Sequence, residues 1–241
     1  MTFSRIVLGR ENRAGPLILS CQFEYDARYF QSYAKKKASI DTLYTRFLEW
    51  AGVLDGRGKT ALDIGAAFGY TVELLEGLGY RALGLDVSQY ASSRSRAVMC
   101  GDAEAPPFRE ESFDLITCFE TIEHLTHPDR AIAGFHGLLK DHGTLLVTTP
   151  TPLGEKVHRR FLRHYPYYST DTDLKPTDAV RDAHHPSIRA CQNWVSAILF
   201  AGFTRVKWHQ FVLTPAFLGK YRVVSSPGTL ATHMIIGANK P

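Results

Sequence analysis

The sequence predicts an α/β protein with a doubly wound, mostly parallel seven-stranded sheet, an N-terminal helical layer and an insertion after the fifth strand. Three observations support this fold class. From Thr60 onward, short apolar runs end in Gly or Asp, they alternate with helical stretches, and one of them leads directly into a glycine turn and a helix. Such alternation is typical of successive βα units, whose strands form a parallel sheet. With 241 residues, 44% of them hydrophobic, the chain can build one substantial core.

We expect one domain over residues 1–241, in four parts. Residues 1–57 form an N-terminal helical cap, 58–150 the central core, 151–189 an irregular insertion, and 190–241 a C-terminal helix and strands. Within the cap, residues 24–54 read as helical. Ser39 can cap the start of the clearest stretch, which keeps the three-and-four spacing of one buried stripe. That stripe comprises Ile40, Leu43, Tyr44, Phe47 and Ala51.

In the core, strands are expected near residues 60–64, 81–86, 97–101, 113–118 and 143–149. A helix begins at Tyr70 and closes at Gly79, the residue type expected just past a helix C-terminus. A second helix begins at Pro128, and Lys140 in its last turn complements the helix dipole. Beyond the insertion, we expect a helix that ends at Gly202 and two final strands, in FTRVKWHQFV and THMIIGA.

Composition excludes several classes of protein. No run approaches the roughly 18 apolar residues of a membrane span, and Arg5 and Arg10 interrupt any N-terminal signal core. The four cysteines lie far apart and form no CxxC pair, which argues against a disulfide scaffold or a zinc-thiolate site. We therefore expect a soluble cytoplasmic protein with no membrane attachment.

The formal charge of +4 is unevenly distributed. Residues 1–150 carry 16 basic and 19 acidic side chains, whereas residues 151–241 carry 12 and 5. A basic C-terminal third can attract an anionic small molecule. It lacks the dense Lys/Arg stripe of a dedicated nucleic-acid binder, so we do not expect a nucleic-acid partner. The sequence gives no indication of the oligomeric state.

The most informative segment is TALDIGAAFGY, an apolar strand that continues into a glycine turn and a helix. Gly65 and Gly69 allow the backbone to approach a ligand closely. Asp86 ends the next strand, where a carboxylate can accept both hydroxyls of a ribose, and Asp102 follows the third strand, where it can meet an adenine edge. Each acid taken alone can also be an N-cap or a solvated loop residue. Three strand ends meet at one edge of a parallel sheet, which favours a ligand site.

The chain here resembles the class I S-adenosylmethionine-dependent methyltransferases, from about Thr60 to Thr149. LDIGAAFG is similar to the family's first motif, GLDVS to its ribose-binding strand, and GDAEAPPFREESFDLITCFETIEHL to a stretch typical of its small-molecule branch. The resemblance implies a Rossmann-like sheet and S-adenosylmethionine as cofactor. The implied cofactor-binding residues are Asp63, Gly65, Ala67, Gly69, Asp86, Val87, Asp102, Ala103 and Phe119. One departure is Ala67, which stands where the family's turn usually has its middle glycine, and whose methyl group narrows the pocket.

Other functions remain as alternatives. A nicotinamide-dependent oxidoreductase would need glycine where Ala67 and Tyr70 stand. The nucleic-acid amino-methylating branch would show an Asn/Asp-Pro-Pro-aromatic motif after the fourth strand, where this chain has FETIEHL. A protein that binds the cofactor or a partner without turnover is a third reading.

Transfer of a methyl group to a hydroxyl benefits from a general base, and histidine is the usual one near neutral pH. We take His124 and His185 as candidate catalytic residues, against the alternative that each is a hydrogen-bonded structural histidine. Because these bases are available, the acceptor is expected to be a small molecule methylated on oxygen rather than nitrogen. His124 and His127 are three residues apart, but no third matched ligand follows, so no metal site is expected.

Overall fold

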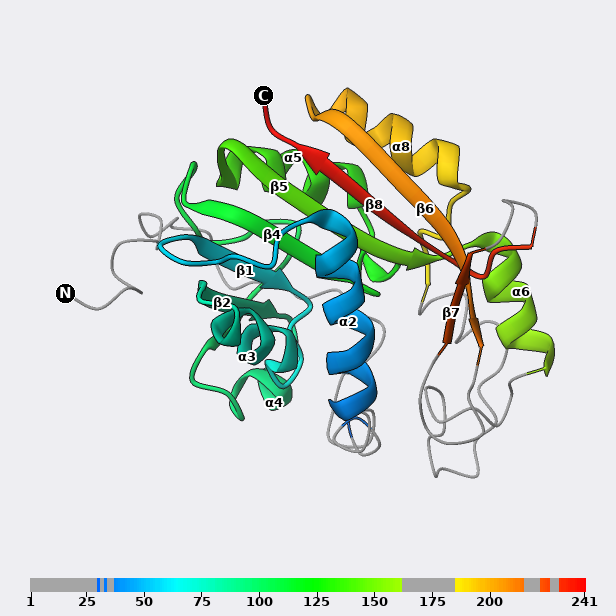
Figure 1. Ribbon diagram of the computed structural model, residues 1–241, viewed down its shortest axis with the longest axis horizontal. Helices are drawn as coiled ribbons and strands as arrows, with labels where there is room; N and C mark the ends of the chain where they lie inside the picture. Colours follow the sequence, from blue (N-terminus) through cyan, green and yellow to red (C-terminus); the bar gives the residue numbers. More distant parts are fainter. Residues whose placement is uncertain (1–29, 31–32, 34–36, 162–184, 215–221, 226–229) are drawn as a thin grey trace.

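The computed structural model describes residues 30, 33, 37–161, 185–214, 222–225 and 230–241 (Figure 1). Its eight strands form one sheet in the order β3-β2-β1-β4-β5-β8-β6-β7. The strands are β1 (Thr60–Ile64), β2 (Arg81–Asp86), β3 (Val98–Cys100), β4 (Phe113–Phe119), β5 (Leu139–Pro150), β6 (Thr204–Thr214), β7 (Arg222–Ser225) and β8 (His233–Asn239). The helices are α2 (Lys37–Ala51), α3 (Tyr70–Gly77), α4 (Gln89–Ser92), η2 (Ile122–His124), α5 (Pro128–Leu138), α6 (Pro152–Phe161) and α8 (Cys191–Phe200).

The predicted α/β fold class is confirmed. Strands β3, β2, β1, β4 and β5 are parallel, while β8 runs antiparallel to β5 and β6 antiparallel to β8. The predicted count of seven strands omits β7, which pairs with β6 at the sheet edge. The parallel strands bring the ends of β1, β2 and β4 to one edge, where the sequence predicts the ligand site.

Two helical layers cover the sheet. Helices α2 and α3 pack on one face, and α5 and α8 pack on the other (Figure 1). The α5 and α8 side contributes Phe135 and Trp194, both essentially fully buried. The alternation of strands and helices thus produces a core on each face of the sheet, as expected for a doubly wound fold.

Helix α2 begins earlier than its predicted cap. The sequence places Ser39 at the start, but the helix begins at Lys37, so Ser39 lies inside the first turn. The Lys37 ammonium bridges Asp41 (3.3 Å) and Glu73 of α3 (2.9 Å). The predicted apolar stripe is correct, because its members from Ile40 to Phe47 are buried.

The junction between α5 and β5 also differs from the prediction. Lys140 was expected in the last helical turn, but α5 ends at Leu138 and Leu139 already pairs with Phe113 of β4. Lys140 therefore belongs to β5, where its ammonium lies 2.7 Å from the Asp114 carboxylate. Strand pairing outweighs the continued helical pattern of LLK.

The predicted irregular insertion at 151–189 contains helix α6, and residues 162–184 lie outside the described part. The Thr151 hydroxyl accepts the Gly154 N–H (2.9 Å), which makes Thr151 the N-cap, and Pro152 occupies the first helical position. This Thr-Pro pair is a helix-start signal that the sequence analysis missed. Within the described residues, every helix is too short or too polar to span a membrane.

Burial predicts how two phenylalanines differ in their contribution to stability. Phe135 of α5 is fully buried, whereas Phe200 at the end of α8 is 96% exposed. Phe135→Ala should lower the free energy of unfolding by about 3–5 kcal/mol, because it removes apolar burial and leaves a cavity. Phe200→Ala should change it by no more than about 0.5 kcal/mol. Urea titration of both variants measures the difference, and similar losses would contradict the described packing of α5.

Candidate cofactor and acceptor site

The turn between β1 and α3 adopts a left-handed backbone at three positions. Gly65 and Gly69 have φ of 75° and 82°, and Ala67 has φ of 48°. An L-residue with a side chain pays a steric cost in this region. Ala67 therefore adopts a backbone conformation that glycine would take without this cost. Its side chain is buried beside Phe30 and Ala91, away from solvent.

Asp86, at the end of β2, anchors this turn. Its carboxylate accepts the Ala67 N–H at 2.7 Å through one oxygen and the Ser88 N–H at 2.8 Å through the other. Burial raises the pKa of Asp86, while these two N–H groups oppose the increase. A carboxylate has about four lone-pair positions, so each oxygen keeps capacity to accept a hydroxyl. This arrangement suits recognition of a ribose diol.

Asp63 lies deeper in the sheet, 2% exposed. The parallel register sets it beside Thr117 of β4, whose hydroxyl donates to the Asp63 carboxylate at 2.7 Å. Burial raises the pKa of Asp63 to about 7, and the negative charge of Asp86 contributes to the increase. Asp63 and Asp86 are thus electrostatically coupled at the same edge of the sheet.

The remaining predicted cofactor residues differ in their position and burial. One Asp102 oxygen accepts the Glu104 N–H (2.8 Å), which closes a local turn after β3. Val87 and Ala103 are partly buried. Phe119 packs into the hydrophobic core under α2, with its ring centroid 4.6 Å from that of Tyr44. Phe119 therefore packs beneath the site as part of the core. The turns after β1 and β2, by contrast, lie at the edge of the sheet.

An aromatic cluster lies around the glycine turn. Phe30 and Tyr33 precede α2, and they pack against Phe68 with ring centroids 5.1 and 5.7 Å away. Tyr33 also stacks on Tyr70 at 5.6 Å, and Phe30 on Tyr90 at 6.1 Å. The N-terminal cap thus contacts the segments on both sides of the turn.

The end of β4 brings the predicted catalytic segment next to the turn. A Cβ atom at Gly65 would overlap the Thr121 hydroxyl oxygen, so only glycine fits against this residue. Thr121 directly precedes η2, which ends at His124. The cofactor turn and the histidine segment are therefore in contact at one edge of the sheet.

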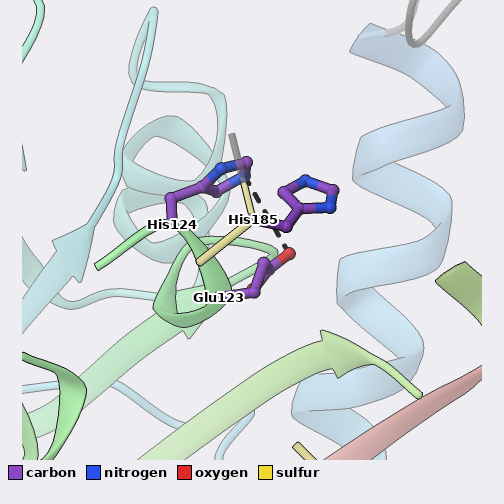
Figure 2. Close-up of side chains that lie close together, drawn as sticks. All are labelled: Glu123, His124 and His185. Carbon is purple, nitrogen blue, oxygen red and sulfur yellow. Dashed lines mark ion pairs between the residues drawn. The ribbon is translucent and has the colours of Figure 1, made fainter. Parts of the chain in front are cut away.

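The structure brings the two predicted catalytic histidines together. The ring centroids of His124 and His185 lie 4.6 Å apart, edge to face, although 61 positions separate them in sequence. Figure 2 shows the two rings side by side above the Glu123 carboxylate. No sequence spacing indicated this proximity.

Three contacts hold the segment that carries His185. The Ser187 N–H donates to the Glu123 carbonyl (3.1 Å), and the Ser187 hydroxyl donates to the Leu125 carbonyl (2.7 Å). Arg189 forms a bidentate pair with Asp129 of α5, at 2.6 and 2.8 Å. The segment before α8 is thus fastened to the segment after β4.

Four more ionisable residues in this region were missed by sequence reasoning. Glu155 of α6 lies 3.0 Å from the Nδ1 atom of His185, and Glu120 lies 3.7 Å from His233. Burial lowers the pKa of His233 to about 4, so it is neutral at pH 7. Burial, with the charges of Glu120 and Glu155, raises the pKa of Glu123 well above its usual range. Glu123 could have been recognised as a candidate site residue in the sequence, because it directly precedes His124 in FETIEHL.

The buried Asp63 predicts a particular dependence of stability on pH. Its pKa is about 7 in the folded protein, against 3.8 for an ordinary aspartate. Between these values the unfolded chain releases a proton that the folded chain keeps, so stability falls as pH rises. Asparagine does not ionise, so the Asp63→Asn variant should not lose stability in this way as pH rises.

We therefore expect the stability of Asp63→Asn, relative to the unsubstituted protein, to rise between about pH 4.5 and pH 7.5. Urea unfolding at both pH values measures the change. Asp141→Asn, at an exposed position in β5, is the matched control and should show no such trend. A constant difference for Asp63→Asn would mean that its pKa is not raised.

Comparison with known proteins agrees with this geometry. Residues 62–147 match a family model described as a methyltransferase domain. The chain is 32% identical over 107 residues to the ubiquinone biosynthesis O-methyltransferase of Glaesserella parasuis, which covers 38% of this chain and 45% of that protein. A relative of the same name from Coxiella burnetii is 31% identical over 103 residues, covering 39% and 44%. The chain thus spans less than half the length of these curated relatives.

A solved structure shares the fold over most of the chain. The S-adenosylmethionine-dependent methyltransferase of Thermotoga maritima matches with a TM-score of 0.64 and 20% identity, covering 89% of this chain and 94% of that one. At this identity the likeness supports the fold alone, while the family-model match falls on the β1 to β5 core that carries the site. Residues 62–147 of this chain are thus similar to a methyltransferase domain, and the chain shares the fold of an S-adenosylmethionine-dependent methyltransferase.

Proposed function

We propose that the protein transfers a methyl group from S-adenosylmethionine to a small-molecule acceptor, with oxygen favoured over nitrogen as the methylated atom. The observation that carries this proposal is the contact between two parts of one sheet edge. The turn that Asp86 anchors lies against Thr121. His124 is three residues after Thr121, and its ring contacts that of His185. This contact supports a cofactor position that is adjacent to a proton-accepting group.

The residues at the edge fit the cofactor. Asp86 keeps hydrogen-bonding capacity for the ribose hydroxyls, and Gly65 and Gly69 add no side chain at the two ends of the turn. Asp63 supplies a carboxylate near the end that would carry the amino acid part. Asp102, Ala103 and Val87 are assigned to the adenine and ribose side by the family resemblance.

The chemistry asks little of the protein beyond positioning. The bound cofactor supplies an activated methyl group on a sulfonium. The protein has to align the acceptor with that methyl group and exclude water. A hydroxyl acceptor must also lose a proton, and we propose that His124 and His185 assist this step. Glu155, hydrogen-bonded to the Nδ1 atom of His185, orients that ring.

Two observations bear on the acceptor. The curated relatives are named as O-methyltransferases, which supports oxygen as the acceptor atom. The basic excess in residues 151–241 favours an anionic acceptor, since opposite charge raises its local concentration. We therefore propose a small hydroxyl compound that carries a carboxylate or phosphate, and no nucleic-acid partner.

Binding of S-adenosylhomocysteine tests the cofactor part of the proposal. Isothermal titration should give saturable one-to-one binding, and Asp86→Ala should abolish it, because the substitution removes the ribose acceptor and releases the Ala67 N–H. Asp141→Ala, at an exposed position in β5, should bind normally. Circular dichroism checks that both variants fold. Equal affinity for Asp86→Ala would contradict the assigned site.

Transfer of labelled methyl groups to a metabolite extract tests turnover. His124→Ala and His185→Ala should each lower the rate at neutral pH by about 100-fold, the typical contribution of acid–base catalysis. His127→Ala is the matched control, since His127 is exposed and three residues from His124. If both substitutions leave the rate unchanged, the histidines do not deprotonate the acceptor. Cofactor binding without any transfer would identify a binding protein instead.

A further inference from the structure

Glu123, His124 and His185 form a cluster with the geometry of a metal site. Each offers one ligand atom, and the three atoms lie within 4.8 Å of one another (Figure 2). Glu123 and His124 come from η2, and His185 from the segment before α8. The sequence showed only His124 and His127 as a spaced pair, and His127 is exposed. The third ligand is supplied by tertiary structure.

The orientation of His185 is typical of a metal ligand. Its Nδ1 atom lies 3.0 Å from a Glu155 carboxylate oxygen, and both side chains are largely buried. In metal sites a ligating histidine usually donates its other ring N–H to a carboxylate, which fixes the tautomer and increases the basicity of the coordinating nitrogen. With Nδ1 directed at Glu155, Nε2 would be the coordinating atom of His185.

Glu123 provides a second, independent observation. Its side chain is 2% exposed, and its Oε2 atom has no hydrogen-bond partner among the described residues. A buried carboxylate without compensation is costly, and it is usually paired or bound to a metal. The neighbouring carboxylates of Glu120 and Glu155 add negative charge, which raises the demand for a cation at this position.

We propose that Glu123, His124 and His185 bind a divalent transition-metal ion, with Glu155 as the hydrogen-bond partner that orients His185. Two imidazole nitrogens and one carboxylate suit Zn²⁺, Mn²⁺ or Fe²⁺, whereas Mg²⁺ and Ca²⁺ prefer oxygen donors. Metal–ligand bonds of about 2.0–2.2 Å require the ligand atoms, now within 4.8 Å of one another, to move closer when the ion binds. Three protein ligands leave coordination positions open.

The open positions give the metal a role in the proposed methyl transfer, on which this part of the inference rests. An acceptor hydroxyl bound there would have a lowered pKa and release its proton to solvent. The oxygen then forms a bond to the methyl carbon while the carbon–sulfur bond breaks, and sulfur keeps the electron pair. The histidines would then assist deprotonation as ligands, and the substrate class would be hydroxyl compounds able to coordinate a metal.

Isothermal titration of the EDTA-treated, dialysed protein with Zn²⁺ tests the site without any acceptor. We expect one-to-one binding, at least tenfold weaker for Glu123→Gln and for His185→Ala. Glu155→Gln should weaken it about 10- to 100-fold, the usual effect of losing such a partner. His127→Ala should bind normally. Millimolar Mg²⁺ should not displace Zn²⁺, and Co²⁺ should give the visible absorption bands of a nitrogen-ligated site.

Three outcomes would each overturn the proposal. They are the absence of one-to-one Zn²⁺ binding, Zn²⁺ affinities of Glu123→Gln and His185→Ala equal to that of the unsubstituted protein, and displacement of Zn²⁺ by Mg²⁺. Folding is checked by S-adenosylhomocysteine titration, which the variants should retain. A variant that binds neither Zn²⁺ nor S-adenosylhomocysteine is not used. In that case the thermal unfolding midpoint of the unsubstituted protein is measured instead, and Zn²⁺ should raise it. Because metal binding is measured without turnover, failure of methyl transfer leaves this result intact, and the two proposals fail separately.

Discussion

The two hydrogen bonds accepted by Asp86 are the interaction on which the site depends. They tie the turn after β1 to the end of β2, through the N–H groups of Ala67 and Ser88. Backbone bonds from Gly65 and Ala66 to the Leu85 carbonyl, at 2.8 and 3.1 Å, reinforce the same link. The turn holds three left-handed residues, and these bonds offset the cost of that backbone. The edge proposed to bind the cofactor is therefore organised by the protein's own hydrogen bonds.

A second constraint joins the cofactor edge to the acceptor side. Gly65 lies so close to Thr121 that the two segments are in van der Waals contact. On the far side of η2, Ser187 and Arg189 fasten the segment that precedes α8. The histidine pair is consequently held between two fixed attachments. Pre-organisation of this kind suits the proposed methyl transfer, since alignment would account for most of the protein's contribution.

The acceptor side is unusually rich in buried ionisable groups. Glu120, Glu123 and Glu155 face His124, His185 and His233 across the carboxyl ends of β4 and β5. Burying charged groups is costly unless they are paired or bound to a cation, and such clusters concentrate at functional sites. The neutral His233 and the raised pKa of Glu123 both follow from this burial.

The sequence by itself determined the order of βα units, because the hydrophobic period changes where a strand gives way to a helix. It located β1 and β2 at their observed bounds and identified Asp86 as the acid at the end of β2. Strand pairing decided that Lys140 belongs to β5 rather than to α5. The start of α6 was decided by the Thr151 cap, which the sequence analysis missed. The contact of His124 with His185, and that of His185 with Glu155, arose only in the tertiary structure. Long-range packing brings distant segments together, and no local periodicity records it.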